Sequence, residues 1–250
     1  MAWWEWFVLG SGFALEFSII VFVLRWRIWR SFPAYSIYIV FVHLRDLLLT
    51  ATLSHPQTYF LIFWFCMPVD ILLTILATLE SFWRVLRSFQ LLRWFRFVLP
   101  TVILAALAYS AWTGYRFPPV EASSAGAAII HATMTSHYVI LSIVILYFLL
   151  VAFFQVPWRI HEHRLILGFG AASLAFAFGG AVRAVFGSHA AVISQQAPPI
   201  GYLIALVIWL TAVVYPVPER IAFPAPSAEM LEDLKFQLRN FRSFVRKDGR

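Results

Sequence analysis

Charged side chains are scarce in this chain, and cysteine is almost missing. Only 12% of the 250 residues are charged, whereas soluble domains carry about 25%. The single cysteine, Cys66, excludes an internal disulfide and gives no information on the redox compartment. Apolar residues take the place of the missing charge, since 62% of the chain is hydrophobic and the mean hydropathy is +0.80. This composition excludes an ordinary soluble domain and indicates an integral membrane protein.

The apolar residues are gathered into seven long blocks. Each has about the 20 residues that a helix needs to cross a hydrocarbon core of about 30 Å. The blocks cover about 6–24, 34–53, 58–79, 97–114, 134–155, 165–186 and 199–215. The sequence therefore predicts an all-α, polytopic membrane protein with seven transmembrane helices in one bundle over 1–222. A more polar, amphipathic stretch follows, and it predicts a cytoplasmic tail helix over 223–250.

The connections between the blocks differ in length and polarity. The longest, 115–133, contains Pro118-Pro119, which excludes a continuous helix through it. Its later part, 127–136, is expected either to begin the fifth helix early or to lie along the membrane interface. The segments 156–164 and 187–198 are predicted to be a cytoplasmic and an outer connection, respectively.

The basic residues are distributed very unevenly between the two sides. Sixteen of the nineteen fall in alternate connections and in the tail, so the positive-inside rule places the N-terminus outside and the C-terminus in the cytoplasm. The N-terminal segment lacks the positive region of a secretory signal, and we expect it to stay as the first span. The net charge of +7 then indicates anionic lipid at the cytoplasmic face, and no nucleic-acid partner is predicted.

Five ionisable side chains lie near mid-depth in the first three spans. They are Glu16 in the first span, His43, Arg45 and Asp46 in the second, and Asp70 in the third. Burying a charged residue at the centre of a spanning helix costs roughly 2.5–3.5 kcal/mol. Because all five share one level to within roughly two helical turns, we take them as the candidate ligand- or proton-binding site.

Helical phase predicts how these side chains face one another. His43 and Asp46 share a polar stripe in the second span, and Asp70 shares one with Cys66 in the third. Arg45 points about 100° away from Asp46 on an ideal helix, so it is expected to reach Glu16 or Asp70 instead of its sequence neighbour.

The charges of this group do not balance. Three carboxyl groups face one certain positive charge, so at least one carboxyl is predicted to be neutral at pH 7, or a cation or water cluster to be present. Three readings stay open: a hydrogen-bonded network that only locks three helices in register, handling of protons or cations, and recognition of a polar ligand.

Two basic stretches are candidates for binding lipid headgroups or a protein partner. The first follows the third span, and the second is one face of the predicted tail helix. The residues are Arg84, Arg87, Arg93 and Arg96 in the first, and Lys235, Arg239, Arg242 and Arg246 in the second. The tail helix is expected to lie on the inner leaflet or to dock on a cytoplasmic protein partner.

No metal or cofactor site is predicted. His161-Glu162-His163 has metal-binding residue types, but its spacing does not place both rings on one face of a helix. We therefore expect these residues to lie in a cytoplasmic connection. No two histidines at matching depth on separate spans suggest haem ligation.

Some short motifs resemble those of known proteins. Phe32-Pro33 opens the second span, Leu44-Arg45 lies at its centre, and an aromatic span runs from Tyr59 to Phe89. Together they resemble uncharacterised seven-helix membrane proteins of soil bacteria and, more distantly, the seven-helix input modules of bacterial membrane sensors. Rhodopsins are excluded because the only lysines, Lys235 and Lys247, lie in the tail and leave no residue for a retinal Schiff base.

The resemblance implies a multi-pass protein of the bacterial inner membrane without enzyme chemistry of its own. The leading hypothesis is a sensor- or receptor-like module that uses the polar cluster on the first three helices and signals to a cytoplasmic partner. The alternatives are a small transporter or proton-coupled carrier, and an accessory subunit of a membrane complex.

Overall fold

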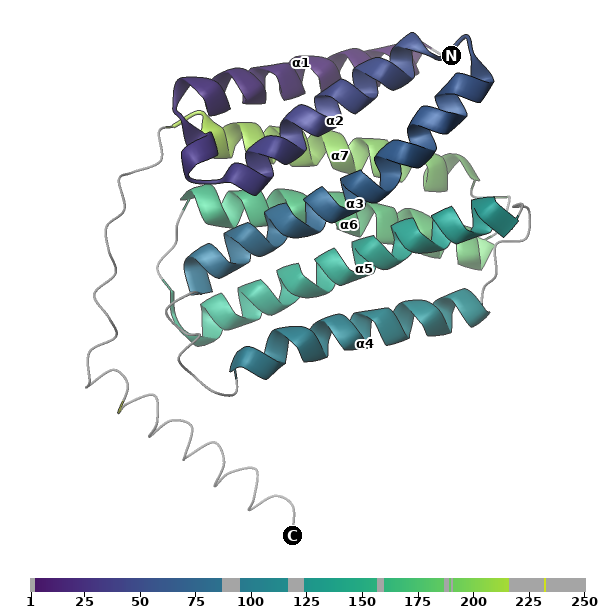
Figure 1. Ribbon diagram of the computed structural model, residues 1–250. Helices are drawn as coiled ribbons and strands as arrows, with labels where there is room; N and C mark the ends of the chain where they lie inside the picture. Colours follow the sequence, from purple (N-terminus) through teal and green to yellow (C-terminus); the bar gives the residue numbers. More distant parts are fainter. Residues whose placement is uncertain are drawn as a thin grey trace.

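The computed structural model describes residues 3–86, 95–116, 124–156, 160–186 and 191–215, together with positions 189 and 232. Within these residues the chain forms seven α-helices, one short 3-10 helix (η1) and no strand (Figure 1). The elements are α1 Trp3–Arg25, η1 Ile28–Arg30, α2 Pro33–Ala51, α3 Pro56–Leu86, α4 Phe95–Arg116, α5 Ser124–Phe153, α6 Ile160–Phe186 and α7 Ala191–Val213. The all-α prediction is confirmed for this part of the chain.

Six of the helices are long and apolar enough to cross a membrane, and α4 has a shorter apolar stretch, Phe97–Thr113. Large apolar side chains remain exposed along them, including Phe65 at 78% and Leu104 at 65%. Lipid tails solvate such side chains as well as another helix does. A helix also satisfies its own backbone groups, which a membrane interior requires. The fold is that of a multi-pass membrane protein.

Helices α5 and α7 begin well before their apolar blocks, which started at about 134 and 199. Helix α5 begins at Ser124, so the early start of the fifth helix is confirmed. Helix α7 begins at Ala191 and contains Pro198 and Pro199, although 187–198 was expected to be a connection. Pro198 packs against Gly179 of α6, where a Cβ atom would be in ordinary contact with the proline ring, at 3.5 Å.

Small residues bring α6 and α7 close together. A Cβ atom on Gly201 would lie 2.1 Å from the Cβ of Ala175, and one on Gly179 would lie 2.8 Å from the backbone oxygen of Ser194. Such approaches let the two backbones pack tightly, which drives helix association in lipid.

We name the ends of the bundle after the predicted orientation. The outer end holds the start of α1 and the turn between α2 and α3, and the inner end lies opposite (Figure 1). The inner half has an aromatic core around Trp209, which is fully buried. Its ring centroid lies 4.8 Å from that of Phe169, 5.7 Å from Tyr38 and 5.9 Å from Tyr35.

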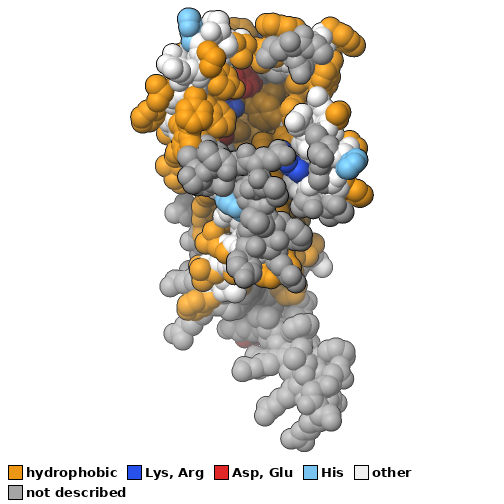
Figure 2. Space-filling model, turned by 90° about the vertical axis from the view of Figure 1, so that its right-hand side faces the viewer, with side chains coloured by type: hydrophobic (Ala, Val, Ile, Leu, Met, Phe, Trp, Pro, Cys, Tyr) orange, Lys and Arg blue, Asp and Glu red, His pale blue; other side chains and the backbone are white. Residues whose placement is uncertain are grey.

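Helix α3 is buried at only one of its ends. All of its buried residues lie in the last third, from Ala77 to Leu86. Figure 1 shows α3 running obliquely across the bundle, with its first turns beside the end of α2. The outer end seen in Figure 2 is hollowed, with acidic and basic side chains visible inside. We call this hollow the outer recess.

Candidate functional site

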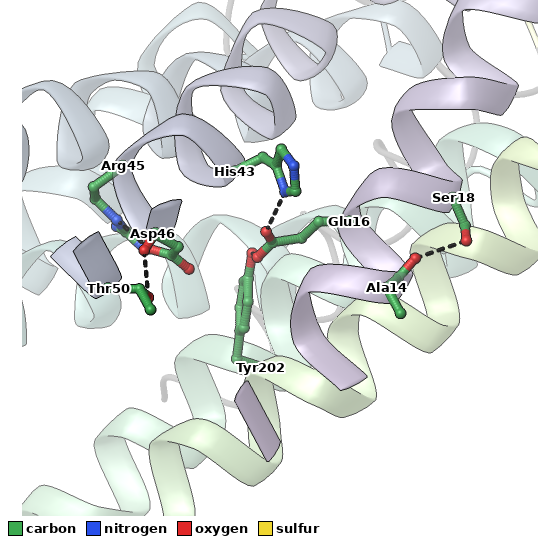
Figure 3. A network of polar contacts seen from close by, with 8 residues as sticks. All are labelled: Ala14, Glu16, Ser18, His43, Arg45, Asp46, Thr50 and Tyr202. Atoms are coloured by element: carbon green, nitrogen blue, oxygen red, sulfur yellow. Dashed lines mark hydrogen bonds and ion pairs between the residues drawn. The ribbon is translucent and has the colours of Figure 1, made fainter. Parts of the chain in front are cut away.

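Glu16 is the most deeply buried carboxyl group of the predicted cluster, with 1% of its side chain exposed. Its Oε2 atom lies 3.0 Å from His43 Nδ1. Its Oε1 atom accepts a hydrogen bond of 2.8 Å from the Tyr202 hydroxyl group. As Figure 3 shows, this one side chain joins α1 to both α2 and α7.

Arg45 joins α2 to α3. Its Nη1 atom lies 2.9 Å from Asp70 Oδ2, and its Nε atom donates to Asp46 Oδ1 at 2.7 Å. The expected contact with Asp70 is therefore present, but the expectation that Arg45 turns away from its sequence neighbour is wrong. A guanidinium group has several donors in one plane, so one side chain pairs with carboxylates on two sides.

These ion pairs are only partly covered. Between 22% and 28% of the side chains of Arg45, Asp46 and Asp70 is exposed. This exposure fits with the charged atoms visible inside the outer recess in Figure 2. The Oδ1 atom of Asp70 is nevertheless buried, and it has no hydrogen-bond partner among the described residues. A buried acceptor left in this way has capacity for another donor.

The structure thus brings all five predicted side chains into two groups at one level. Glu16 and His43 form one group, and Arg45 with its two aspartates forms the other. Two aromatic rings of α1 border the first group: Phe13 and Phe17 have ring centroids 5.8 Å and 6.3 Å from that of His43. No three His, Cys, Asp or Glu side chains of the described chain are arranged to hold a metal ion.

Sequence reasoning missed Tyr202. It carries no charge and lies in an apolar block, so composition did not distinguish it. The available signal was its position along the helix: Tyr202 lies at the middle of α7. A phenol there needs a buried partner for its hydroxyl group, and Glu16 is that partner.

A second polar group, also missed, lies toward the inner end. The Glu80 carboxylate of α3 accepts hydrogen bonds from the backbone N–H groups of Ala34 (3.2 Å) and Tyr35 (3.0 Å). These are free N–H groups in the first turn of α2, which starts with Pro33. A carboxylate from another helix therefore caps α2, where the helix dipole also favours negative charge.

Arg84 lies beside this cap and faces the interior of the bundle. Its Nε atom lies 3.3 Å from Glu162 Oε1 of α6, its Nη1 atom donates to the Ser31 backbone oxygen, and its guanidinium carbon lies 4.3 Å from the centre of the Phe32 ring. Only 17% of the side chain is exposed. Arg84 was predicted to meet lipid headgroups or a protein partner; here a buried carboxylate of α6 pairs with it.

That partner belongs to the His161–His163 segment, which was expected to be a connection. Helix α6 begins at Ile160, and His161, Glu162 and His163 are all buried. His161 Nε2 lies 3.1 Å from the Tyr215 backbone oxygen.

The other predicted basic contacts fall outside the described residues. These are Arg87, Arg93 and the tail residues Lys235, Arg239, Arg242 and Arg246. Arg96 lies in the first turn of α4, but its side chain is not among those described. The predicted tail helix over 223–250 is likewise outside the described residues, apart from Glu232.

Comparison of the chain with known proteins does not indicate the role of this site. The chain matches no protein-family model, no curated protein and no solved structure. Its function is therefore argued from its own geometry.

Proposed function

We propose that this protein is a receptor- or sensor-like module of the bacterial inner membrane. Its ligand site is the polar cluster on α1, α2 and α3, reached through the outer recess. The observation that supports this most strongly is the bridge from Arg45 to Asp70, which is one-quarter exposed and ties α2 to the least buried part of α3. A ligand that competes for either side chain would change how α3 is held.

The inner half of the bundle supports recognition over transport of a sizeable substrate. Below the cluster, the fully buried rings of Trp209, Phe169 and Tyr35 fill the space between α2, α6 and α7. The site is thus open toward one end of the bundle and packed toward the other, as expected for a receptor.

Helix α3 provides a route from the site to the inner end. Its last third is packed, and it carries both Glu80, which caps α2, and Arg84, which pairs with Glu162 of α6. A change at Asp70 would reach these inner contacts through residues 70–86, which follow Pro68 and contain no further proline. Two discrete arrangements of α3 would then form the switch.

The proposal includes the predicted orientation and partner. All seven helices span the membrane, with the N-terminus outside and the C-terminus in the cytoplasm. The basic segments then lie against anionic lipid, and the tail helix docks on a cytoplasmic protein. A reporter fused to the C-terminus that is active only outside the cytoplasm would contradict this orientation.

Cys66 gives a direct test of the recess. It is the only cysteine, it is partly buried, and it lies four residues before Asp70 on the same face of α3. A membrane-impermeant maleimide should label it in sealed vesicles from the side of the α1 start. In the variant Asp70→Asn, in which the bridge to Arg45 is weakened, the Cys66 thiol should be labelled faster. Cys66→Ala is the negative control, because it has no thiol.

Two results would contradict the proposal. One is labelling only from the side of the C-terminus, which would mean that the recess opens the other way. The second is an unchanged labelling rate in Asp70→Asn, which would mean that the bridge does not hold the outer part of α3.

A further inference from the structure

A small cavity lies between α1, α2 and α7, beside the Glu16–Tyr202 hydrogen bond. Its volume is about 110 Å³. Its polar wall consists of Glu16, Asp46 and Tyr202, and its other walls are apolar. The apolar lining residues are Val8, Leu9, Gly12, Phe13, Pro199 and Leu203.

The polar wall is acidic. In Figure 3 the Asp46 carboxyl group points toward the Glu16–Tyr202 pair, and a negative charge on one of the two carboxyl groups disfavours a charge on the other. Arg45 pairs with Asp46 but also serves Asp70, so this one positive charge is shared. Each carboxylate has about four lone-pair positions, and the described residues occupy one on each oxygen of Glu16 and one on Asp46. Acceptors are therefore left over for a donor with a positive charge.

The volume of the cavity and its apolar walls limit the size and the chemical type of the ligand. An apolar cavity of about 150 Å³ holds benzene, with six heavy atoms, so this cavity has room for about four or five. Its apolar walls favour hydrocarbon next to the charged end. A primary alkylamine, like a lysine side chain with a pKa of about 10.4, carries its positive charge at pH 7.

We propose that this cavity binds a small protonated primary amine, with its ammonium group between Glu16, Asp46 and Tyr202 and its alkyl chain against Leu9, Phe13 and Leu203. This assignment rests on the proposed function for the location of the site, and it names the class of ligand.

The test is binding of n-butylammonium to the purified full-length protein in detergent, measured as the rise in unfolding temperature with ligand concentration. A ligand that binds only the folded state raises the midpoint progressively as its concentration passes the dissociation constant. n-Butanol has the same chain without the charge, and sodium or ammonium chloride has the charge without the chain. The proposal expects butylammonium to raise the midpoint more than any of these at equal concentration.

Two kinds of variant locate the binding. Glu16→Gln should weaken butylammonium binding at least tenfold, since it removes the buried charge. Gly12→Val should weaken butylammonium binding to a similar extent without changing any charged side chain. A Cβ atom on Gly12 would meet only Leu203, at 4.0 Å, so the methyl groups of the valine would enter the cavity. Gly10→Val is the matched control on the same helix, because a Cβ atom on Gly10 has nothing within 4 Å and Gly10 does not line the cavity.

Each other outcome overturns the assignment. Equal effects of butanol would show a merely apolar cavity, and equal effects of sodium would show an inorganic cation site. Binding that survives Gly12→Val would place the amine elsewhere. If butylammonium does not bind but Cys66 is labelled as expected, the amine assignment is refuted and the proposed function stands. If butylammonium binds but Asp70→Asn does not change the labelling of Cys66, the binding site stands and the proposed switch in α3 is refuted.

Discussion

The bridge made by Arg45 gives the sharpest prediction about the stability of this protein. Arg45→Gln would leave the carboxylates of Asp46 and Asp70 without a positive partner. Removing one partner of a buried ion pair costs about 3–5 kcal/mol. Because these side chains are 22% to 28% exposed, the lower end applies, and we expect a loss of about 3 kcal/mol in the free energy of unfolding.

Asp70→Asn should cost less. Arg45 then keeps its contact with Asp46 at 2.7 Å, so no ion is left alone, and the loss should be about 1.5–2 kcal/mol, the lower part of the range for a hydrogen bond to a charged group. In the double variant only Asp46 remains without a partner. The two losses should therefore fall short of additivity by about 1–2 kcal/mol, within the range measured for residues in contact.

The assay is reversible unfolding by SDS in mixed micelles, followed by near-ultraviolet circular dichroism. Ser18→Ala is the control and should leave the midpoint in place, because the Ser18 hydroxyl group is partly exposed and bonds to the Ala14 backbone oxygen of its own helix. Additive losses, or a larger loss in Asp70→Asn than in Arg45→Gln, would refute the reasoning that one guanidinium group serves two carboxylates.

Gly168→Ala should lower the unfolding midpoint by an amount equivalent to about 1–3 kcal/mol, because its Cβ would lie 2.2 Å from Nε1 of the buried Trp209. Gly10→Ala is the control and should leave the midpoint unchanged, because a Cβ atom there has nothing within 4 Å. Equal midpoints of the two variants would contradict the packing of α6 against α7. Tyr202→Phe should cost about 1–3 kcal/mol by leaving a buried oxygen of Glu16 without its donor, whereas a stability equal to the native protein would mean that this hydrogen bond is not formed. Proteoliposomes loaded with a pH-sensitive dye should show no proton flux above that of empty vesicles; flux that disappears in Glu16→Gln would favour the proton-coupled carrier instead.

The membrane character of this protein and the depth of its ionisable groups were readable from the sequence. A span of about 20 residues has a fixed length along its axis, so Glu16, Arg45 and Asp70 fall near the middle of their helices however the helices are arranged. Periodicity also places Asp46 and His43 on one side of α2, as the structure has them.

Periodicity does not determine which helix lies against which face. Packing decides that, and in lipid packing depends on where small residues let backbones approach, as Gly201 does against Ala175. This is why Tyr202 appeared in the cluster only once α7 was placed beside α1.

The inner end shows the same limit for the ends of helices. The sequence predicted that Arg84 binds lipid headgroups or a protein partner and that 156–164 is a connection. The fold instead starts α6 at Ile160 and buries Glu162 against Arg84. A charged residue near the end of an apolar block is compatible with headgroups or with a buried partner, and only the position of the opposite charge on another helix distinguishes the two.

The sequence by itself thus determined that several charges share one level of a helical membrane protein with too many carboxyl groups for its one arginine. The tertiary structure decided their partners: it joined Glu16 to Tyr202, divided Arg45 between Asp46 and Asp70, and left a cavity beside them. The reason is physical: depth is a property of one helix, whereas a contact or a cavity depends on how several helices tilt and rotate against one another.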